Sequence, residues 1–184
     1  MAPSYAPSSF GNVTVARKVF LVDGASVAGK KVDYSVSELF VSGGDSSFSG
    51  DVTFTADTAI DIAADATLSF SGYVSSAAGC TTELTGDGKL VFEAATVDAR
   101  LSGDGNIVFD VDDECVFRGD LSAFTGTVHV SSGTLLLHPD TAVNGSISFS
   151  AAQGASYRRL EDGDFTDFIK DGREFFRSAD GIAH

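Results

Sequence analysis

Residues 117–135 read Phe117-Arg118-Gly119-Asp120-Leu121-Ser122-Ala123-Phe124-Thr125-Gly126-Thr127-Val128-His129-Val130-Ser131-Ser132-Gly133-Thr134-Leu135. Two short segments with apolar residues at alternate positions are separated by Gly119-Asp120, Thr125-Gly126 and Ser132-Gly133, pairs that are typical of turns. Such alternation predicts a strand with one buried face, because successive side chains of a strand point to opposite sides. A chain that turns so often can bury these apolar positions only around a narrow core. We therefore expect residues 117–135 to form one coil of a β-solenoid.

The same residues resemble the autotransporter-associated β-strand repeat. Its pattern is filled by Gly119-Asp120, Ser122, Phe124-Thr125-Gly126, Val130 and Gly133-Thr134-Leu135, and Phe117 stands near its leading apolar position. The resemblance covers about residues 84–150; it is good over residues 117–135 and only echoed elsewhere. It implies a surface-displayed, right-handed β-helix of the passenger type. What it implies is an architecture and not a reaction.

Self-similar segments support several stacked coils. Residues 84–92 recur as residues 101–109, an offset of 17, while residues 124–128 are echoed by residues 143–147, an offset of 19, and by residues 48–52. Such periods are typical of solenoids, in which each coil buries its apolar side only against its neighbours. We expect roughly five or six coils of about 20 residues each between Ser42 and Ala152.

A third echo begins with aspartate. It occurs at Asp57-Thr58-Ala59-Ile60, Asp65-Ala66-Thr67-Leu68, Asp98-Ala99-Arg100-Leu101 and Asp140-Thr141-Ala142-Val143. An aspartate side chain favours a turn because it accepts hydrogen bonds from nearby backbone groups. We expect each aspartate to start a turn and the apolar residue three positions later to re-enter the core.

The two ends of the chain differ from its middle. Residues 1–11 are rich in Pro and Ser and predict an extended arm; because residues 12–41 are charged strands, we interpret residues 1–41 as a cap or anchor. Residues 42–152 are assigned to the solenoid and residues 153–184 to a charged, Phe-rich C-terminal cap. Within that cap, residues 164–177 predict two strands about an Asp-Gly turn, with a short amphipathic helix as the alternative.

The predicted fold class is therefore all-β: a right-handed parallel β-solenoid, or β-helix, with an N-terminal β cap or anchor and a C-terminal capping hairpin. Aromatic residues near the ends are the candidate partner-binding residues: Tyr5, Phe10, Phe165, Phe168, Phe175 and Phe176. The four C-terminal phenylalanines need covering, either by the last coil or by another subunit. We expect a homo-oligomer, and a trimer is one arrangement that would cover them.

Composition excludes several kinds of partner. The formal net charge is −14, so nucleic acid is not an expected partner, because binding it needs a basic surface. No segment approaches the roughly eighteen apolar residues that span a bilayer, and the start of the chain lacks the features of a secretory signal. Cys80 and Cys115 are the two cysteines; we favour buried free thiols, with a disulfide across coils as the alternative.

One acidic run could suggest a metal. Asp110, Asp112, Asp113 and Glu114 are a weak candidate site for Ca²⁺, a cation that prefers oxygen ligands. The run lacks the spacing of known calcium-binding loops, so a solvated turn is the favoured interpretation and we expect no metal and no cofactor.

Other polar residues have structural explanations. Asp87 and Asp104 could stand one above the other, like the carboxylates of a glycan-cleaving enzyme, but each lies in a repeated Gly-Asp-Gly corner. His129 is expected on the outward side of a strand, and no nucleophile and base pair suggests itself. Arg118-Gly119-Asp120 spells an integrin-type tripeptide, but its Gly-Asp belongs to the repeat. We expect the protein not to be an enzyme.

Three functions are consistent with these expectations. The first is a non-enzymatic structural protein at the surface of a bacteriophage virion, a capsid decoration or fibre-like protein anchored to other virion proteins through its N-terminal region. The alternative is a passenger or adhesin fragment of a bacterial autotransporter, at the cell surface or outside the cell. The third is a β-helix that binds or cleaves polysaccharides. A start at Met1 without a signal favours the first.

Overall fold

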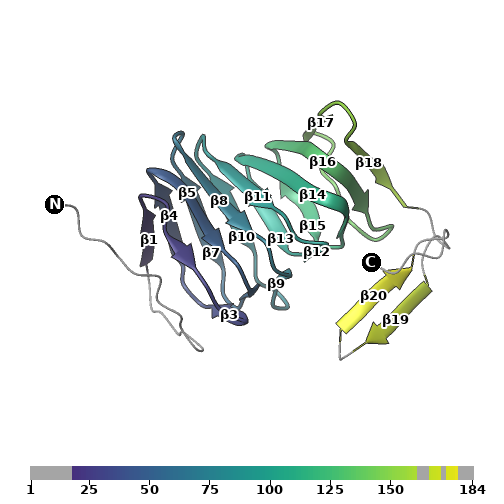
Figure 1. Ribbon diagram of the computed structural model, residues 1–184, viewed down its shortest axis with the longest axis horizontal. Coiled ribbons are helices and arrows are strands. Elements are labelled where there is room, and N and C mark those ends of the chain that lie inside the picture. The colour runs from purple at the N-terminus through teal and green to yellow at the C-terminus, as the bar shows by residue number, and fades with distance from the viewer. Residues whose placement is uncertain (1–17, 161–165, 171–172, 178–184) are drawn as a thin grey trace.

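The computed structural model describes residues 18–160 in full and the backbone of residues 166–170 and 173–177. The regular elements of these residues are all β-strands, and they wind into a parallel β-solenoid of about seven coils (Figure 1). The predicted all-β solenoid is thus confirmed. In Figure 1 the coils follow one another along the long axis, from β1 in purple to β18 in green.

Each coil runs across three faces. The first face is a six-stranded sheet of β1 (Lys18–Val22), β4 (Glu38–Ser42), β7 (Thr58–Ile62), β10 (Thr82–Thr85), β13 (Arg100–Gly103) and β15 (Asp120–Phe124). The second face contains β2 (Ser26–Val27), β5 (Gly44–Phe48), β8 (Ala66–Phe70), β11 (Lys89–Phe92), the beginnings of β14 (Asn106–Phe117) and β16 (Thr127–Leu137), and β17 (Ser148–Ala151). The third contains β3 (Lys31–Tyr34), β6 (Asp51–Phe54), β9 (Val74–Ser76), β12 (Thr96–Asp98), the ends of β14 and β16, and β18 (Ser156–Arg159).

We number the coils by their strands. Coils 1 to 4 are β1–β3, β4–β6, β7–β9 and β10–β12. Coil 5 is β13 with β14, coil 6 is β15 with β16, and coil 7 is Val143, β17 and β18, where Val143 bridges Leu121 of β15. The second and third faces form one twelve-stranded sheet, because β14 and β16 bend from one face into the other.

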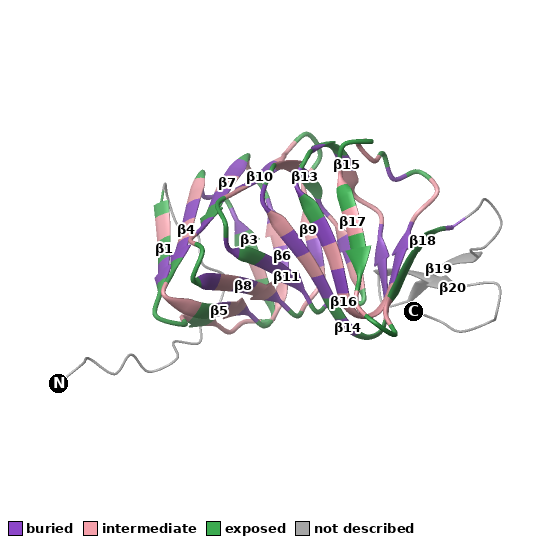
Figure 2. Ribbon diagram, turned by 90° about the horizontal axis from the view of Figure 1, so that it is seen from above, coloured by how far each residue is buried: buried purple, intermediate pink, exposed green. Residues whose placement is uncertain are grey.

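The interior contains a column of stacked phenylalanine rings. Phe48, Phe70, Phe92 and Phe109 occupy the same register position in coils 2 to 5. Their ring centroids are successively 5.2, 6.0 and 5.4 Å apart, and all four side chains are buried. Buried and exposed residues alternate along the strands in Figure 2, as the sequence alternation predicts.

The stacking offset differs between faces. On the second face Phe92 pairs with Phe109, which confirms the predicted offset of 17 there. On the first face Thr82 pairs with Leu101, an offset of 19. The difference lies in the corner between these faces, which is longer in coil 4, where it contains Gly86-Asp87-Gly88.

The predicted offset of 19 between residues 124–128 and 143–147 is wrong. Val128 pairs with Phe149, an offset of 21. The sequence similarity aligns the turn residues Gly126 and Gly145. The register is set instead by the strands, because their inward-facing side chains must meet the core.

The aspartate echo marks the points where the chain re-enters the core. Ile60, Leu68 and Leu101 are buried, and Val143 packs against the core. In two of these segments the residue after the aspartate is a buried threonine whose hydroxyl donates to a carbonyl of the preceding coil. Thr58 donates to Val36 at 2.8 Å and Thr141 to Phe117 at 2.9 Å. These bonds satisfy polar groups at buried corners.

The strands of the stack continue outside residues 42–152. β1 and β3 pair in parallel with β4 and β6, so residues 18–34 form the first coil. Their charge lies at outward positions such as Lys18 and Lys31, while Leu21 and Tyr34 are buried. At the other end, β18 pairs in parallel with β16.

Residues 164–177 contain the predicted pair of strands. β19 (Thr166–Lys170) and β20 (Arg173–Arg177) are antiparallel, and Phe168 pairs with Phe175 in register. The alternative of an amphipathic helix is therefore wrong. The side chains of Phe168, Phe175 and Phe176, and residue Phe165 as a whole, lie outside the described part of the chain, as do the turn residues Asp171 and Gly172.

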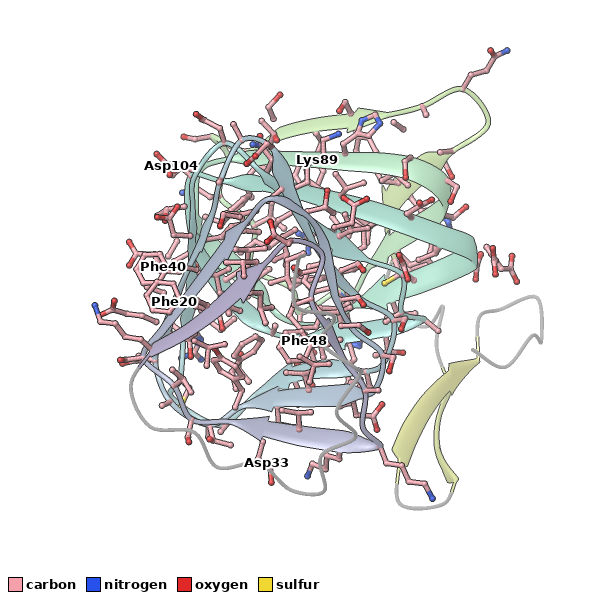
Figure 3. The ribbon with its side chains drawn as sticks, turned by 60° about the vertical axis from the view of Figure 1, so that its left-hand side comes forward. Phe20, Asp33, Phe40, Phe48, Lys89 and Asp104 are labelled. Carbon is pink, nitrogen blue, oxygen red and sulfur yellow. The ribbon has the colours of Figure 1, made fainter. Side chains whose placement is uncertain are left out.

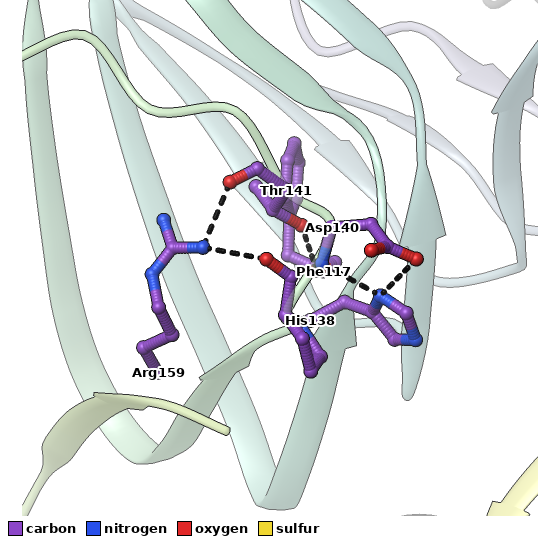
Figure 4. A network of polar contacts seen from close by, with 6 residues as sticks. Phe117, His138, Asp140, Thr141 and Arg159 are labelled. Carbon is purple, nitrogen blue, oxygen red and sulfur yellow. Dashed lines mark hydrogen bonds and ion pairs between the residues drawn. The ribbon is translucent and has the colours of Figure 1, made fainter. Parts of the chain in front are cut away.

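An arginine closes the last coil (Figure 4). The Nη1 atom of Arg159 donates to the carbonyl oxygens of Pro139 and Thr141, both at 2.9 Å. In the same loop the backbone N–H of Asp140 donates to Nδ1 of His138 at 3.2 Å. The two hydrogen bonds of Arg159 tie the loop before coil 7 to the final strand of that coil, after which no further coil of the described chain follows.

Replacing Gly72 with Ala is expected to destabilise the fold by about 1–3 kcal/mol, because a Cβ there would overpack the corner. The added atom would lie 2.3 Å from the carbonyl carbon of Gly50 in the preceding coil. Gly145→Ala is the matched control, since a Cβ at Gly145 meets no heavy atom within 4 Å. Urea unfolding of both variants measures the difference; equal stabilities would contradict the close stacking of the corners.

Replacing Phe109 with Ala is expected to cost about 3–5 kcal/mol of unfolding free energy, because it removes one ring from the buried column. Phe109 is 1 % exposed, whereas Phe20 is 64 % exposed, so Phe20→Ala is the matched control and should cost under about 1 kcal/mol. Chemical denaturation monitored by circular dichroism gives both values. A loss below about 1 kcal/mol for Phe109→Ala would contradict the ring column.

Candidate functional site

A groove of about 770 Å³ lies on the outside of the second face. Its lining residues point outward from successive coils and stack in columns, because parallel strands hold equivalent positions side by side. One column contains Asp45, Thr67, Lys89, Asn106 and Thr127. The next column contains Ser69, Val91, Val108 and His129. Asp87 lies at the corner before β11, and Glu93, Asp110 and Ser131 lie beyond the second column.

The floor of the groove is apolar at its centre. Val91 and Val108 are paired in register on β11 and β14 and alternate with the inward-facing residues on either side of them. Val91 is only 9 % exposed although it does not pack into the main cluster of core side chains. Its neighbours in the groove therefore shelter it from solvent.

The polar wall beside this floor is fixed by hydrogen bonds. Asn106 donates through Nδ2 to the carbonyl oxygens of Asp87 and Gly88, at 3.3 and 3.2 Å. Its Oδ1 accepts a hydrogen bond from the hydroxyl of Thr127 at 2.8 Å. At the other side, Nδ1 of His129 lies 2.9 Å from the hydroxyl oxygen of Ser150. The wall is thus held in place before any ligand arrives.

The charges of the groove are mostly negative. Asp45, Asp87, Glu93 and Asp110 carry carboxylates, and Lys89 carries an ammonium group. Within residues 18–160 no carboxylate lies within 4.0 Å of Lys89, so this ammonium group is available to a ligand. Figure 3 shows Lys89 on the outside of the solenoid.

The predicted outward position of His129 is confirmed, since it lies between the buried Val128 and Val130. Asp87 and Asp104 do not occupy equivalent positions. The backbone N–H of Asp104 donates to the carbonyl of Leu84, whereas the carbonyl of Asp87 accepts from Asn106. The longer corner of coil 4 causes this shift, so the backbone of Asp104 lies over Leu84 and not over Asp87.

The acidic run Asp110-Val111-Asp112-Asp113-Glu114 forms the outer corner of coil 5. Asp110 pairs with Ser132 and Glu114 with Thr134, so β14 bulges between them. Asp110 accepts a 2.6 Å hydrogen bond from Ser132, and Asp112 and Asp113 are exposed. In the described residues, no three His, Cys, Asp or Glu side chains gather closely enough to hold a metal ion.

The two cysteines are free thiols. Cys115 is completely buried, and this burial raises the pKa of its thiol. Cys80 is half-buried, in the loop between β9 and β10. The expected free thiols are therefore present, but only one of them lies in the core.

The burial difference predicts unequal thiol reactivity. In the native protein a thiol reagent such as Ellman's reagent is expected to modify Cys80, while Cys115 reacts only after unfolding, because the raised pKa and burial both suppress its thiolate. The Cys80→Ser variant is the control and should show no native reaction. Two fast-reacting thiols in the native protein would contradict the burial of Cys115. If no thiol reacts, even after unfolding, until a reducing agent is added, the two cysteines form a disulfide.

The tripeptide Arg118-Gly119-Asp120 lies at a packed corner. A Cβ at Gly119 would lie 1.9 Å from the carbonyl oxygen of Ala99. Hydrogen bonds from Ser122 and the nearby Arg100 guanidinium, 3.7 Å away, hold the pKa of Asp120 below its ordinary value. The carboxylate is thus engaged within the repeat, which argues against its display as an attachment motif.

Exposed apolar side chains gather at the ends of the described stack. We call Phe20, Val22 and Phe40 the N-terminal patch: the rings of Phe20 and Phe40 stack at 5.2 Å, and Phe20 and Val22 are 64 % and 52 % exposed. Figure 3 shows the two rings together on the outside. At the other end, Tyr157 is 43 % exposed and stacks on Phe149.

The candidate partner-binding residues Tyr5 and Phe10 lie outside the described residues. Among the residues that are described, no helix is long and apolar enough to cross a membrane.

The groove was not among the sites predicted from the sequence. Its signal was present in the 17-residue repeat, where Leu90-Val91-Phe92 and Ile107-Val108-Phe109 each place three apolar residues in a row. Strict alternation would make the middle residue polar, so each run marks an apolar side chain on the outer surface.

Comparison of the chain with protein families, with curated proteins and with solved structures finds no match. The resemblance to the autotransporter-associated repeat therefore stays a prediction.

Proposed function

We propose that this chain is a non-enzymatic structural protein of a bacteriophage virion surface, a capsid decoration or fibre-like protein anchored through its N-terminal region. The observation that carries the proposal is the distribution of apolar surface. Within residues 18–160 the exposed large hydrophobic side chains are Phe20 and Val22 on coil 1 and Tyr157 on coil 7. The coils between them expose mainly polar side chains, as expected of a rod attached by an end and solvated along its sides.

The N-terminal patch supports attachment at that end. Phe20 and Phe40 present an aromatic surface, and the ammonium group of Lys18 lies 5.7 Å from the centre of the Phe40 ring. Aromatic residues bordered by charged groups are typical of the centres of protein interfaces. Among residues 18–160, two large hydrophobic side chains are exposed in this patch, Phe20 and Val22, and one, Tyr157, at the opposite end, which favours the N-terminal end as the anchor.

Immunolabelling tests whether the protein lies on the surface of phage particles. Antibodies raised against the purified chain are expected to label the outer surface of intact phage particles in immunogold electron microscopy. Labelling of bacterial cell envelopes in cultures without phage would instead support the alternative, a passenger or adhesin fragment of an autotransporter. Light scattering on the full chain tests the expected homo-oligomer in the same preparation.

Variants of the full chain test the anchor. The double substitution Phe20→Ser with Val22→Ser is expected to weaken co-sedimentation with purified particles by roughly tenfold or more, because it removes the aromatic centre of the contact. Tyr157→Ser changes an exposed aromatic side chain at the opposite end and should leave binding unchanged. If Tyr157→Ser weakens binding and the double variant binds normally, the anchor lies at the C-terminal end. Equal binding of all variants would contradict anchoring through the N-terminal patch and through Tyr157.

A further inference from the structure

We propose that the groove on the second face binds an uncharged, extended oligosaccharide chain that lies along the solenoid axis, across successive coils. This inference does not rest on the proposed virion setting, because it uses only the residues that line the groove. It concerns binding alone.

The floor of the groove is apolar at its centre. Val108 faces outward and is partly exposed between two rows of polar side chains, beside Val91, which is only 9 % exposed. A pyranose ring has the matching division, with C–H groups on its faces and hydroxyl groups around its edge. Stacking the ring on the partly exposed Val108 removes apolar surface from water, while the hydroxyls reach the polar rows.

The walls of the groove offer both donors and acceptors of hydrogen bonds. Sugar hydroxyls both donate and accept hydrogen bonds, so they need partners of both kinds. The ammonium group of Lys89 is a donor, the carboxylates of Asp87 and Glu93 are acceptors, and the hydroxyls of Thr67 and Ser69 serve as both. Because Asn106 and Thr127 are already held by internal hydrogen bonds, ordering this wall costs little on binding.

The charge of the groove favours an uncharged ligand. Four carboxylates, those of Asp45, Asp87, Glu93 and Asp110, line the groove beside Lys89, and the whole chain carries a net charge of −14. This field repels polyanions such as nucleic acids and polyuronates. An uncharged chain meets no such penalty.

The shape of the groove favours an extended ligand. The column from Asp45 in coil 2 to Thr127 in coil 6 crosses four strand spacings, which is about 19 Å. A straight column of this length matches an extended chain better than a coiled one. A peptide would bind a sheet through backbone hydrogen bonds at an edge, but the groove lies on a face, where the strand backbones are already paired with neighbouring coils.

Titration of the full chain with cellohexaose tests the inference. We expect saturable heat in calorimetry and amide shifts in ¹⁵N NMR spectra centred on Lys89, Val91, Asn106 and Val108. Maltohexaose, which is uncharged but curved, should bind several-fold more weakly, and hexagalacturonate, which is extended but anionic, should give no saturable binding. Circular dichroism of the substituted chains described next checks that each of them retains the fold.

Matched substitutions locate the site. Val108→Ser is expected to weaken cellohexaose binding roughly tenfold, and Lys89→Ala roughly three- to tenfold. The control makes the lysine change elsewhere: Lys30→Ala, at an exposed position in the loop before β3, should leave binding unchanged.

Three results would overturn the assignment: no shift with either uncharged hexasaccharide at millimolar concentration, tighter binding of hexagalacturonate, or equal effects of the groove and control substitutions. Equal binding of an extended Ser-Gly hexapeptide would assign the groove to polypeptide and would also overturn it. None of these results depends on whether the chain labels phage particles.

Discussion

Hydrogen bonding between successive coils is the constraint on which the rest of this structure depends. Every ladder in the described solenoid joins a strand to one in an adjacent coil, so the backbone of each strand is paired with neighbouring coils and not within its own coil. The same register brings Phe70 over Phe48 and Phe92 over Phe70. Corners must then approach as closely as strands do, and Gly72 lies against Gly50 because no side chain fits between them.

This constraint also organises the outer surface. Outward residues that are distant in the sequence form straight columns, and the groove arises where two such columns contain Val91 with Val108 and Lys89 with Asn106. No contiguous motif encodes the groove. It is a product of stacking, and its residues acquire a common role only when adjacent coils bring them together.

The sequence predicted those features that depend on local pattern. Alternation of apolar residues predicted the strands, the aspartate echo marked the points at which Ile60 and Leu101 enter the core, and the Asp-Gly pair predicted the hairpin of β19 and β20. Features that depend on corner length were not predictable in the same way. A corner can gain residues without disturbing the strands beside it. The similarity that aligns Gly126 with Gly145 therefore gave the wrong partner for Val128, and Asp87 and Asp104 do not occupy equivalent positions.

Anchoring such a stack at one end has a mechanical consequence. Each coil is joined to the next by rows of hydrogen bonds that run along the stacking axis, so tension along this axis loads them in the direction in which they break. The rod would then yield by peeling away one coil at a time, beginning with the coil closest to the applied load. Arg159 ties the final strand to the loop containing Pro139 and Thr141 and so reinforces the coil farthest from an N-terminal anchor.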